Sequence, residues 1–361
     1  MAECKGKSEA PQLIRCTVEA GKGCGVVIRG EGACVLVDCQ VRRHALMGLV
    51  VAGSAATLSM QGGVVEANQT GGLYLSELAR VSCARTSVQE NGAVGALVKR
   101  GAIPSFVDCS FNNNHGPGVW FSERGAGSMQ GCNIVGNAGA GLLIDTLSNP
   151  TIRQCTIKRC RDCGVLSARG GLGTLDGCTI ESNKPVGVTV GEKANPVVFQ
   201  CSLDGNAPYH MLVMDEGLGH LHGNRITNVE VAAVVLGHSA RCIIADNLIK
   251  LPLKAVKPVK RSQHGSKNLA GAIDAAGKSQ VSAQDHGPVA VCWSDHEGQV
   301  HGVQPVEVQR LSFGCAHATL ATVQERLLDQ RPLSQLIASA RKQVLPVSLS
   351  VSLSVFMLLR A

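Results

Sequence analysis

Apolar and polar residues in the first 250 positions recur with a period of 23 residues. We number each repeat from its start position, which is occupied in turn by Cys16, Cys39, Gly63, Thr86, Cys109, Cys132, Cys155, Cys178, Cys201, Asn224 and Asn247. Counted from there, positions 2, 10, 12 and 20 are apolar in successive repeats, and no helical spacing lies between them. Each repeat therefore predicts three short strands that point these side chains inward.

Position 9 is glycine in eight consecutive repeats, from Gly25 to Gly187, and is then His210 and Ala233. Glycine recurring at one position predicts a tight bend in every repeat. Repeats of this length with three β-segments are typical of a parallel β-helix, in which each repeat forms one coil. We expect an all-β fold over residues 12–250, a solenoid of about ten coils stacked about 4.8 Å apart.

Position 5 forms a column of asparagines, interrupted once by Cys160: Asn68, Asn91, Asn114, Asn137, Asn183 and Asn206. Like side chains lie over one another in stacked coils, so each amide can donate to one neighbour and accept from the other. We expect a structural asparagine ladder, and therefore a turn role for Asn68 although it begins an Asn-Gln-Thr sequon. The cysteines of the start position are expected to be inward-facing free thiols, because a spacing of about 4.8 Å is too wide for a disulfide.

Position 11 lies between two inward positions and should therefore point outward, yet it is apolar: Val27, Val50, Tyr74, Leu97, Trp120, Leu143, Leu166, Thr189, Leu212 and Val235. The outward position of the first strand is polar by contrast, as in Thr17, Gln40 and Ser110. An exposed apolar stripe is typical of an interaction surface, with Tyr74 and Trp120 as anchors for a protein partner. The alternatives are the ordinary β-propensity of Val and Leu, or a C-terminal tail that folds back over the stripe.

Position 14 is a charged column beside this stripe: Glu77, Arg100, Glu123, Thr146, Arg169, Glu192, Asp215 and His238. We expect Glu77, Arg100, Glu123 and Arg169 to form a charged rim for the partner, with opposite charges attracting between coils. Glu192 and Asp215 are the adjacent acids of the column. Their carboxyls could lie near the roughly 5 Å separation of a retaining glycosidase, so they are the candidate catalytic pair, with a solvated charge ladder as the alternative.

Composition limits the remaining functions. The chain is 45% hydrophobic but only 3% aromatic, and its net charge of +7 is not gathered into a basic stripe interleaved with aromatics, so we expect no nucleic-acid partner. Residues 1–11 lack an apolar export segment, which favours a reducing compartment: cytoplasmic, with the nucleus as a further possibility. We expect no cofactor, because no phosphate loop, dinucleotide fingerprint or nucleophile elbow occurs.

Two sets of residues include zinc-ligand types, but neither has the number and spacing of ligands that a zinc site needs, so we expect no metal. Cys160 and Cys163 form a single C-x-x-C pair without a second pair. The other set has enough ligands for one zinc but irregular spacing: Cys292, His296, His301, Cys315 and His317.

A slower alternation of 46 residues is superimposed on the repeat, with Pro104, Pro150 and Pro196 alternating with Gly127, Gly173 and Gly219. Together with segments such as Asn149-Pro150-Thr151-Ile152 and Cys155-Thr156-Ile157, this pattern resembles the right-handed β-helix repeat of F-box only protein 11 and its relatives. The resemblance covers about residues 16–250 and implies a right-handed coil. It also implies substrate recognition for a ubiquitin ligase, with cullin-ligase components as partners. No F-box is found, so the chain could supply only the recognition half, or be part of a longer adaptor.

Beyond the repeats we predict a basic low-complexity linker over residues 251–317 and a helical, apolar tail over residues 318–361. Helical spacing between Ala318 and Val344 would cap the open end of the solenoid or bind a partner. The uncharged stretch from Val344 to Leu359 is short for a membrane span and alternates Val or Leu with Ser, so we expect an edge strand or a tail and no membrane anchor.

The function expected from these features is that of a non-catalytic protein-interaction scaffold. The alternative is a carbohydrate-binding or carbohydrate-active β-helix, a glycoside hydrolase or lyase, with Glu192, Asp215 and Trp120 near the sugar.

Overall fold

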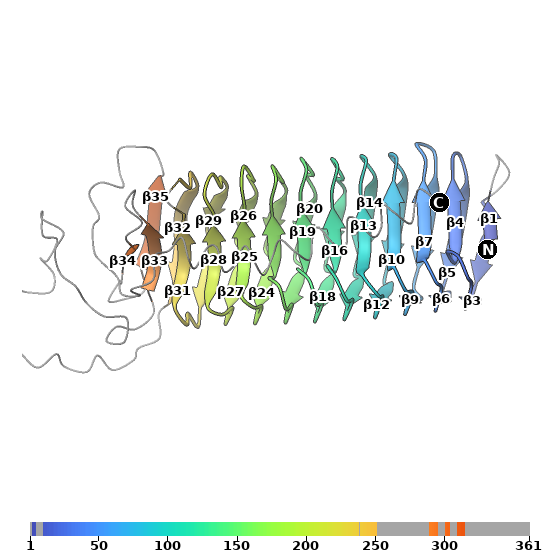
Figure 1. Ribbon diagram of the computed structural model, residues 1–361, viewed down its shortest axis with the longest axis horizontal. Helices are drawn as coiled ribbons and strands as arrows, with labels where there is room; N and C mark the ends of the chain where they lie inside the picture. The colour runs from blue at the N-terminus through green and yellow to red at the C-terminus, as the bar shows by residue number, and fades with distance from the viewer. Residues whose placement is uncertain are drawn as a thin grey trace, which may run out of the picture.

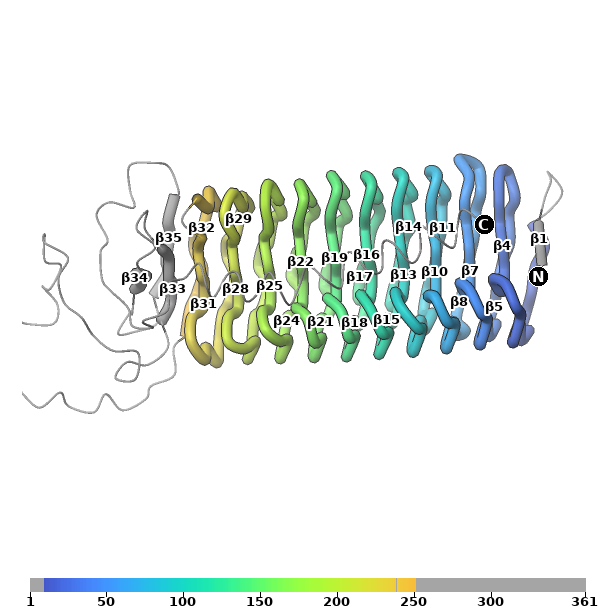
Figure 2. The backbone as a smooth tube through the Cα atoms, in the orientation of Figure 1, coloured from blue at the N-terminus to red at the C-terminus, as the bar shows by residue number. Residues whose placement is uncertain are grey.

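Each 23-residue repeat forms one coil of three short parallel strands, and the coils stack into a straight rod (Figures 1 and 2). The computed structural model describes residues 10–237 and 239–250 with their side chains. It describes the backbone alone for β1 (Ala2–Cys4), β33 (Val289–Ser294), β34 (Val300–Val303) and β35 (Gln309–Gly314). The fold is an all-β, right-handed parallel solenoid of about ten coils, as the repeat predicted.

One strand from every coil contributes to the first sheet, sheet A. Its strands in the rod are β4 (Val26–Arg29), β7 (Met47–Ala52), β10 (Gly71–Ser76), β13 (Val94–Val98), β16 (Val119–Phe121), β19 (Leu142–Ile144), β22 (Val165–Ser167), β25 (Val186–Val190), β28 (Tyr209–Val213) and β31 (Ala232–Leu236). Each pairs in parallel with the strand 23 or 24 residues further on, as in Trp120 opposite Leu143.

The other two strands of each coil lie in sheet B. One column contains β2 (Gln12–Ile14), β5 (Ala33–Val37), β8 (Thr57–Gln61), β11 (Arg80–Ala84), β14 (Ile103–Val107), β17 (Ser128–Gln130), β20 (Thr151–Arg153), β23 (Thr174–Asp176), β26 (Val197–Phe199), β29 (His220–His222) and β32 (Ile243–Ile249). The second contains β3 (Thr17–Glu19), β6 (Gln40–Arg42), β9 (Val64–Glu66), β12 (Ser87–Gln89), β15 (Ser110–Asn112), β18 (Asn133–Val135), β21 (Thr156–Lys158), β24 (Thr179–Glu181), β27 (Ser202–Asp204) and β30 (Arg225–Thr227).

Three strands fall within the range that the sequence predicted as linker. β33 continues sheet A in parallel beside β31, β34 pairs antiparallel with β33, and β35 pairs antiparallel with β32. The rest of the predicted linker and the predicted helical tail at 318–361 lie outside the described residues. Among the described residues, no helix has the length and apolar character of a membrane span.

The interior of the rod is filled by the columns that the repeat predicted to face inward. Phe106, Phe111 and Phe121 are fully buried there, among aliphatic side chains and the thiols of the start position. No disulfide forms among the cysteines described with their side chains, and Cys109 Sγ donates to the carbonyl oxygen of Cys83 at 3.3 Å. Burial raises the pKa of the Cys83 thiol to about 12, so this interior cysteine is a neutral, unreactive packing group.

Glycine is required at position 9 for a reason other than the predicted bend. None of the eight adopts a positive φ. A Cβ at Gly118 would lie 2.8 Å from the carbonyl oxygen of Gly141 and 2.7 Å from Nδ2 of Asn137. Glycine is needed there because adjacent coils and the asparagine ladder leave no room for a side chain.

The asparagine ladder is confirmed. Each buried amide donates from Nδ2 to the Oδ1 of the asparagine on the next coil, 3.0 Å away from Asn68 through Asn137, and also to a backbone carbonyl. Cys160 interrupts the ladder, which resumes from Asn183 to Asn206. A second, short ladder joins Asn224 to Asn247 at the start position.

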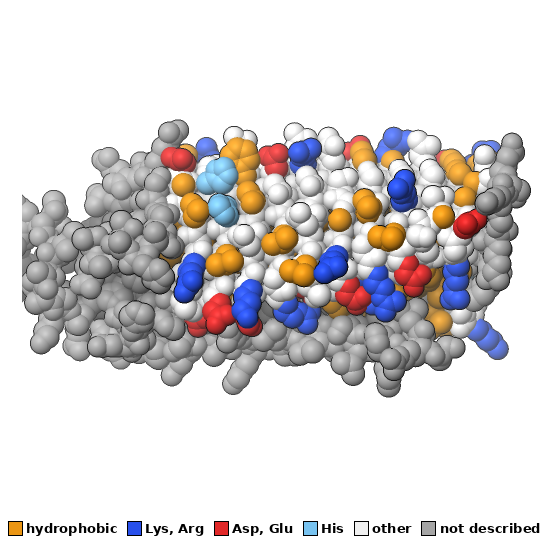
Figure 3. All heavy atoms as spheres, turned by 90° about the horizontal axis from the view of Figure 1, so that it is seen from above, with side chains coloured by type: hydrophobic (Ala, Val, Ile, Leu, Met, Phe, Trp, Pro, Cys, Tyr) orange, Lys and Arg blue, Asp and Glu red, His pale blue; other side chains and the backbone are white. Residues whose placement is uncertain are grey.

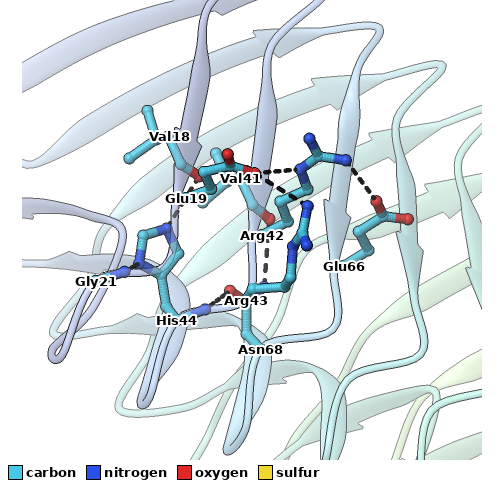
Figure 4. A network of polar contacts seen from close by, with 9 residues as sticks. All are labelled: Val18, Glu19, Gly21, Val41, Arg42, Arg43, His44, Glu66 and Asn68. Atoms are coloured by element: carbon cyan, nitrogen blue, oxygen red, sulfur yellow. Dashed lines mark hydrogen bonds and ion pairs between the residues drawn. The ribbon is translucent and has the colours of Figure 1, made fainter.

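Histidines lie at both ends of the main ladder. His44 occupies position 5 before the first asparagine, and its backbone N–H donates to Asn68 Oδ1 at 3.0 Å (Figure 4). Its ring Nδ1 accepts from the N–H of Gly21 at 3.1 Å, so Nε2 carries the proton and donates to the carbonyl oxygen of Val18. At the other end, Asn206 Nδ2 donates to Nδ1 of the fully buried His210 at 3.2 Å.

His210 therefore fills the position 9 that glycine holds in earlier coils. The next coil has Val229 at position 5, which ends the ladder there. Burial lowers the pKa of the His210 imidazole to about 4, opposed by the backbone of Asn228 and the charge of Asp204. The ring is neutral at physiological pH.

Candidate functional site

The outer face of sheet A is a continuous apolar surface. The position 11 side chains form a hydrophobic cluster that is separate from the interior core, whereas positions 10 and 12 belong to that core. The predicted alternation is therefore correct: Trp120 points out of the rod while Val119 and Phe121 point into it. We call the outer apolar surface of sheet A the stripe.

The predicted exposure of the stripe is wrong. Tyr74 is 5% exposed, Leu166 4%, Leu97 and Trp120 3%, and Leu143 2%. Outward-facing apolar residues of sheet B behave differently, since Ile103 is 51% exposed and Val107 38%. A single sheet layer does not hide outward side chains to this degree, so the stripe is a covered surface and not a solvent-facing one.

A second column, at position 8, widens the stripe and was missed by the sequence analysis. Its buried members in the same cluster are Met47, Val94, Ala140, Cys163, Val186, Tyr209 and Ala232. The signal was present, because position 8 is apolar in nearly every repeat. Strict alternation assigns positions 8 and 11 to opposite faces, but the structure places both columns in the cluster outside sheet A.

Two polar atoms within the stripe are buried without a hydrogen-bond partner in the described part of the chain. They are Nε1 of Trp120 and Oγ1 of Thr189. Buried indole and hydroxyl groups are normally hydrogen-bonded, because an unmade bond costs about 1–3 kcal/mol. The stripe thus offers one donor and one hydroxyl to whatever covers it.

A charged rim borders the stripe where the column at position 14 was predicted. Arg100 lies between two acids, with Nε 3.2 Å from Glu123 Oε2 and NH1 3.7 Å from Glu77 Oε1. Lys99, whose side chain is only 8% exposed, also reaches Glu123, with 3.0 Å between Nζ and Oε1. Its ammonium lies 6.0 Å from the centroid of the Tyr74 ring, which ties the rim to the stripe.

Arg169, the remaining predicted rim residue, pairs outside the predicted column. Its NH2 contacts Oδ2 of Asp145, a fully buried carboxylate at position 13 of the preceding coil. The sequence paired Arg169 with neighbours at position 14, because repeat spacing does not show which side chains turn inward at the corner.

Acidic and basic side chains also alternate along one edge of the face drawn in Figure 3, where hydrophobic side chains are dispersed singly.

The candidate catalytic acids lie in the turns that follow β25 and β28. Glu192 is exposed, and its Oε1 lies 3.9 Å from Nζ of the neighbouring Lys193. Asp215 accepts from the backbone N–H of Ser239 at 3.4 Å through Oδ1. These contacts are those of a turn and a surface ion pair, so the catalytic assignment stays a prediction.

A shallow cavity of about 570 Å³ lies at the corner before sheet A, lined by Ala138, Arg161, Asp162, Lys184, Pro185 and Pro208. Asp162 is 7% exposed, and its Oδ1 has no hydrogen-bond partner among the described residues. Burial raises the pKa of the Asp162 carboxyl to about 7. The sequence contains no signal for this group, because aspartate occurs at its repeat position only once.

Metal ligands do not gather in the described part of the chain, where no three His, Cys, Asp or Glu side chains are grouped to hold an ion. Cys160 and Cys163 are both buried, and Cys163 belongs to the stripe. The side chains of the second candidate set, from Cys292 to His317, lie outside the described residues.

Comparison with known proteins identifies the repeat. The profile of a family described as "Right handed beta helix region" matches residues 3–149, 60–195 and 128–264. No curated protein is significantly similar in sequence.

Similar solved structures include the A-module of mannuronan C-5 epimerase AlgE4 from Azotobacter vinelandii (15% identity, TM-score 0.31, 65% of this chain and 62% of that module). They also include a hyper-glycosylated TibA fragment (10% identity, TM-score 0.33, 67% of this chain and 88% of that chain). A third is PfbA, a surface adhesin of Streptococcus pneumoniae (10% identity, TM-score 0.37, 64% of this chain and 80% of that chain). The chain thus spans less than two thirds of the epimerase module. We draw no conclusion about activity from structural similarities this distant.

Proposed function

The chain belongs to the right-handed β-helix family, and on that premise we propose that it is a non-catalytic scaffold that binds a protein partner through the stripe. One observation carries the proposal: a two-column apolar surface extends along about ten coils on the outside of sheet A, apart from the interior core. Surfaces of this size and continuity are used for association, because covering them removes apolar area from water.

The composition of the stripe supports a protein partner over a small molecule. Trp120, Tyr74 and Tyr209 supply aromatic anchors, and the ion-paired rim of Arg100 and Glu123 borders one edge. An apolar centre with aromatic anchors and a charged rim is the usual anatomy of a protein interface.

The resemblance to F-box only protein 11 adds a narrower hypothesis, in which the partner is a substrate or component of a cullin ubiquitin ligase. Neither the family match nor the similar structures bear on ubiquitin ligases. This hypothesis therefore rests on the sequence resemblance alone.

Affinity capture from cells, quantified by mass spectrometry, tests the proposal. The test variant is Leu97→Asp with Leu143→Asp in the stripe, and the matched control is Ile103→Asp with Val107→Asp, which places the same two charges on the outside of sheet B. Circular dichroism must show both variants folded. We expect specific proteins to be lost from the stripe variant alone and to bind the purified wild-type chain directly.

If both variants retain the same proteins, the stripe is not the partner surface. Turnover of a soluble glycan that is lost in Glu192→Gln would instead favour the carbohydrate-active alternative.

A further inference from the structure

The stripe is covered, and its cover must be apolar and long. Leu97, Trp120 and Leu143 point away from the interior and are nevertheless 2–3% exposed, while the outward Ile103 of sheet B is 51% exposed. The members of the stripe cluster all come from sheet A and the turns beside it. Residues of the described rod form the floor of this surface, so its cover comes from elsewhere.

We propose that the cover is the C-terminal segment of the same chain, Val347–Leu359, lying in extended form along the stripe. This inference concerns what occupies the surface that the proposed function assigns to a partner. It implies that the partner must displace the segment, which would make the segment an intramolecular competitor.

The lengths agree. From Val27 to Val235 the stripe spans nine coil-to-coil steps, or about 43 Å at about 4.8 Å per step. The 13 residues from Val347 to Leu359 extend over about 40 Å at about 3.3 Å per residue.

The connection is also long enough. β35 ends at Gly314 beside β32, at the C-terminal end of the rod. The 32 residues from 315 to 346 separate that end from the segment. The segment could therefore begin at the last coil and run back towards the first.

The chemistry is complementary. The segment has no charge, and Val347, Leu349, Val351, Leu353 and Val355 alternate with serines, so an extended form has one apolar side. That side matches the apolar stripe. The carbonyl groups of an extended backbone are acceptors of the kind that Trp120 Nε1 and Thr189 Oγ1 lack.

Tryptophan fluorescence of the full-length chain tests the proposal. Trp293→Phe leaves Trp120 as the sole tryptophan. In this background the test variant carries Leu349→Asp, Val351→Asp and Leu353→Asp. The matched control carries Ser350→Asp, Ser352→Asp and Ser354→Asp, which adds the same three charges to the other side of the extended segment.

We expect the test variant to shift Trp120 emission to longer wavelength and to raise its acrylamide quenching constant about threefold, while the control stays protected. A synthetic peptide of residues 344–361 should restore protection when added to a chain that ends at residue 343. If Trp120 is as well protected in the test variant and in the shortened chain as it is in the parent Trp293→Phe chain, the proposal is wrong.

The outcome is independent of the proposed function. If the test variant exposes Trp120 but no protein gains affinity for the uncovered stripe, the cover is real and the proposed partner surface is not. If both the exposure and the affinity rise, the segment competes with the partner.

Discussion

Asn114 donates a hydrogen bond from Nδ2 to Oδ1 of Asn137, 3.0 Å away on the next coil. The same Nδ2 donates to the carbonyl oxygen of Val88, and the Oδ1 of Asn114 accepts from both the backbone N–H and the Nδ2 of Asn91. One buried side chain therefore connects three coils, and the neighbouring asparagines are buried as well.

Replacing Asn114 should cost more stability than replacing an exposed asparagine in a strand of sheet B. Asn114→Ala removes the acceptor of two buried Asn91 donors, the backbone N–H and Nδ2, while Asn137 Oδ1 keeps only its bond from the backbone N–H of residue 114. We therefore expect a loss of about 3 kcal/mol in the free energy of unfolding. Asn133→Ala, on the outside of β18, should stay within about 0.5 kcal/mol. Chemical denaturation of both variants measures the difference, and equal effects would contradict the ladder's structural role.

Cys160 marks a gap in the ladder that one substitution should close. An asparagine there would give the amide and backbone N–H of Asn137 an oxygen acceptor in place of a thiol, and it would keep the bond from the Cys160 N–H to Asn183 Oδ1, now 3.0 Å. We expect Cys160→Asn to raise the free energy of unfolding by about 1 kcal/mol. Cys160→Ala should lower it. A Cys160→Asn chain less stable than Cys160→Ala would show that the site cannot accommodate the amide.

Replacing either of two glutamates at position 14 of the charged rim should affect stability to different degrees. Glu123 is the partner of Lys99, which is nearly buried, while Glu77 pairs with the exposed Arg100. Glu123→Gln should therefore destabilise the fold by about 1–2 kcal/mol, because it leaves a poorly hydrated ammonium unpaired. Glu77→Gln should change stability by less than about 0.5 kcal/mol. Thermal unfolding at low and high salt distinguishes these two effects.

His210 should make the rod sensitive to acid. Burial lowers the pKa of its imidazole from 6.5 to about 4, so the unfolded chain binds the proton more readily than the folded chain between these values. The stabilising contribution is complete above pH 6.5 and is lost as the pH falls towards 4. Relative to His210→Ala, the wild-type chain should lose about 2 kcal/mol between pH 7.5 and pH 5. A parallel pH dependence in both chains would exclude His210 as the titrating group.

Asp162 should give the opposite pH dependence of stability to His210. Burial raises the pKa of its carboxyl from 3.8 to about 7, so the folded chain holds the proton more tightly and gains stability at low pH. That contribution is lost as the pH rises from about 4 to 7. Relative to wild type, Asp162→Asn should therefore gain about 2–3 kcal/mol between pH 5 and pH 7.5. Because His210 and Asp162 offset each other in the wild-type chain, both variants must be measured against it at each pH.

Much of the architecture could be predicted from sequence because a solenoid repeats the same local environment. The period of 23 residues places like side chains over one another, so the inward columns, the ladder from Asn68 to Asn137 and the ion pairs around Arg100 could all be predicted without coordinates. The pairing of Arg169 with Asp145 could not, because it joins different positions of the repeat at a corner.

What the sequence by itself determined is which residues share a column and, for positions 10 to 12, which side of the sheet each side chain occupies, because these follow from a constant period and strand alternation. Only the tertiary structure decided whether an outward column meets water. Trp120 and Ile103 both point out of the rod, yet one is 3% exposed and the other 51%. Exposure depends on what packs over a surface, which no local pattern of hydrophobic and polar positions encodes.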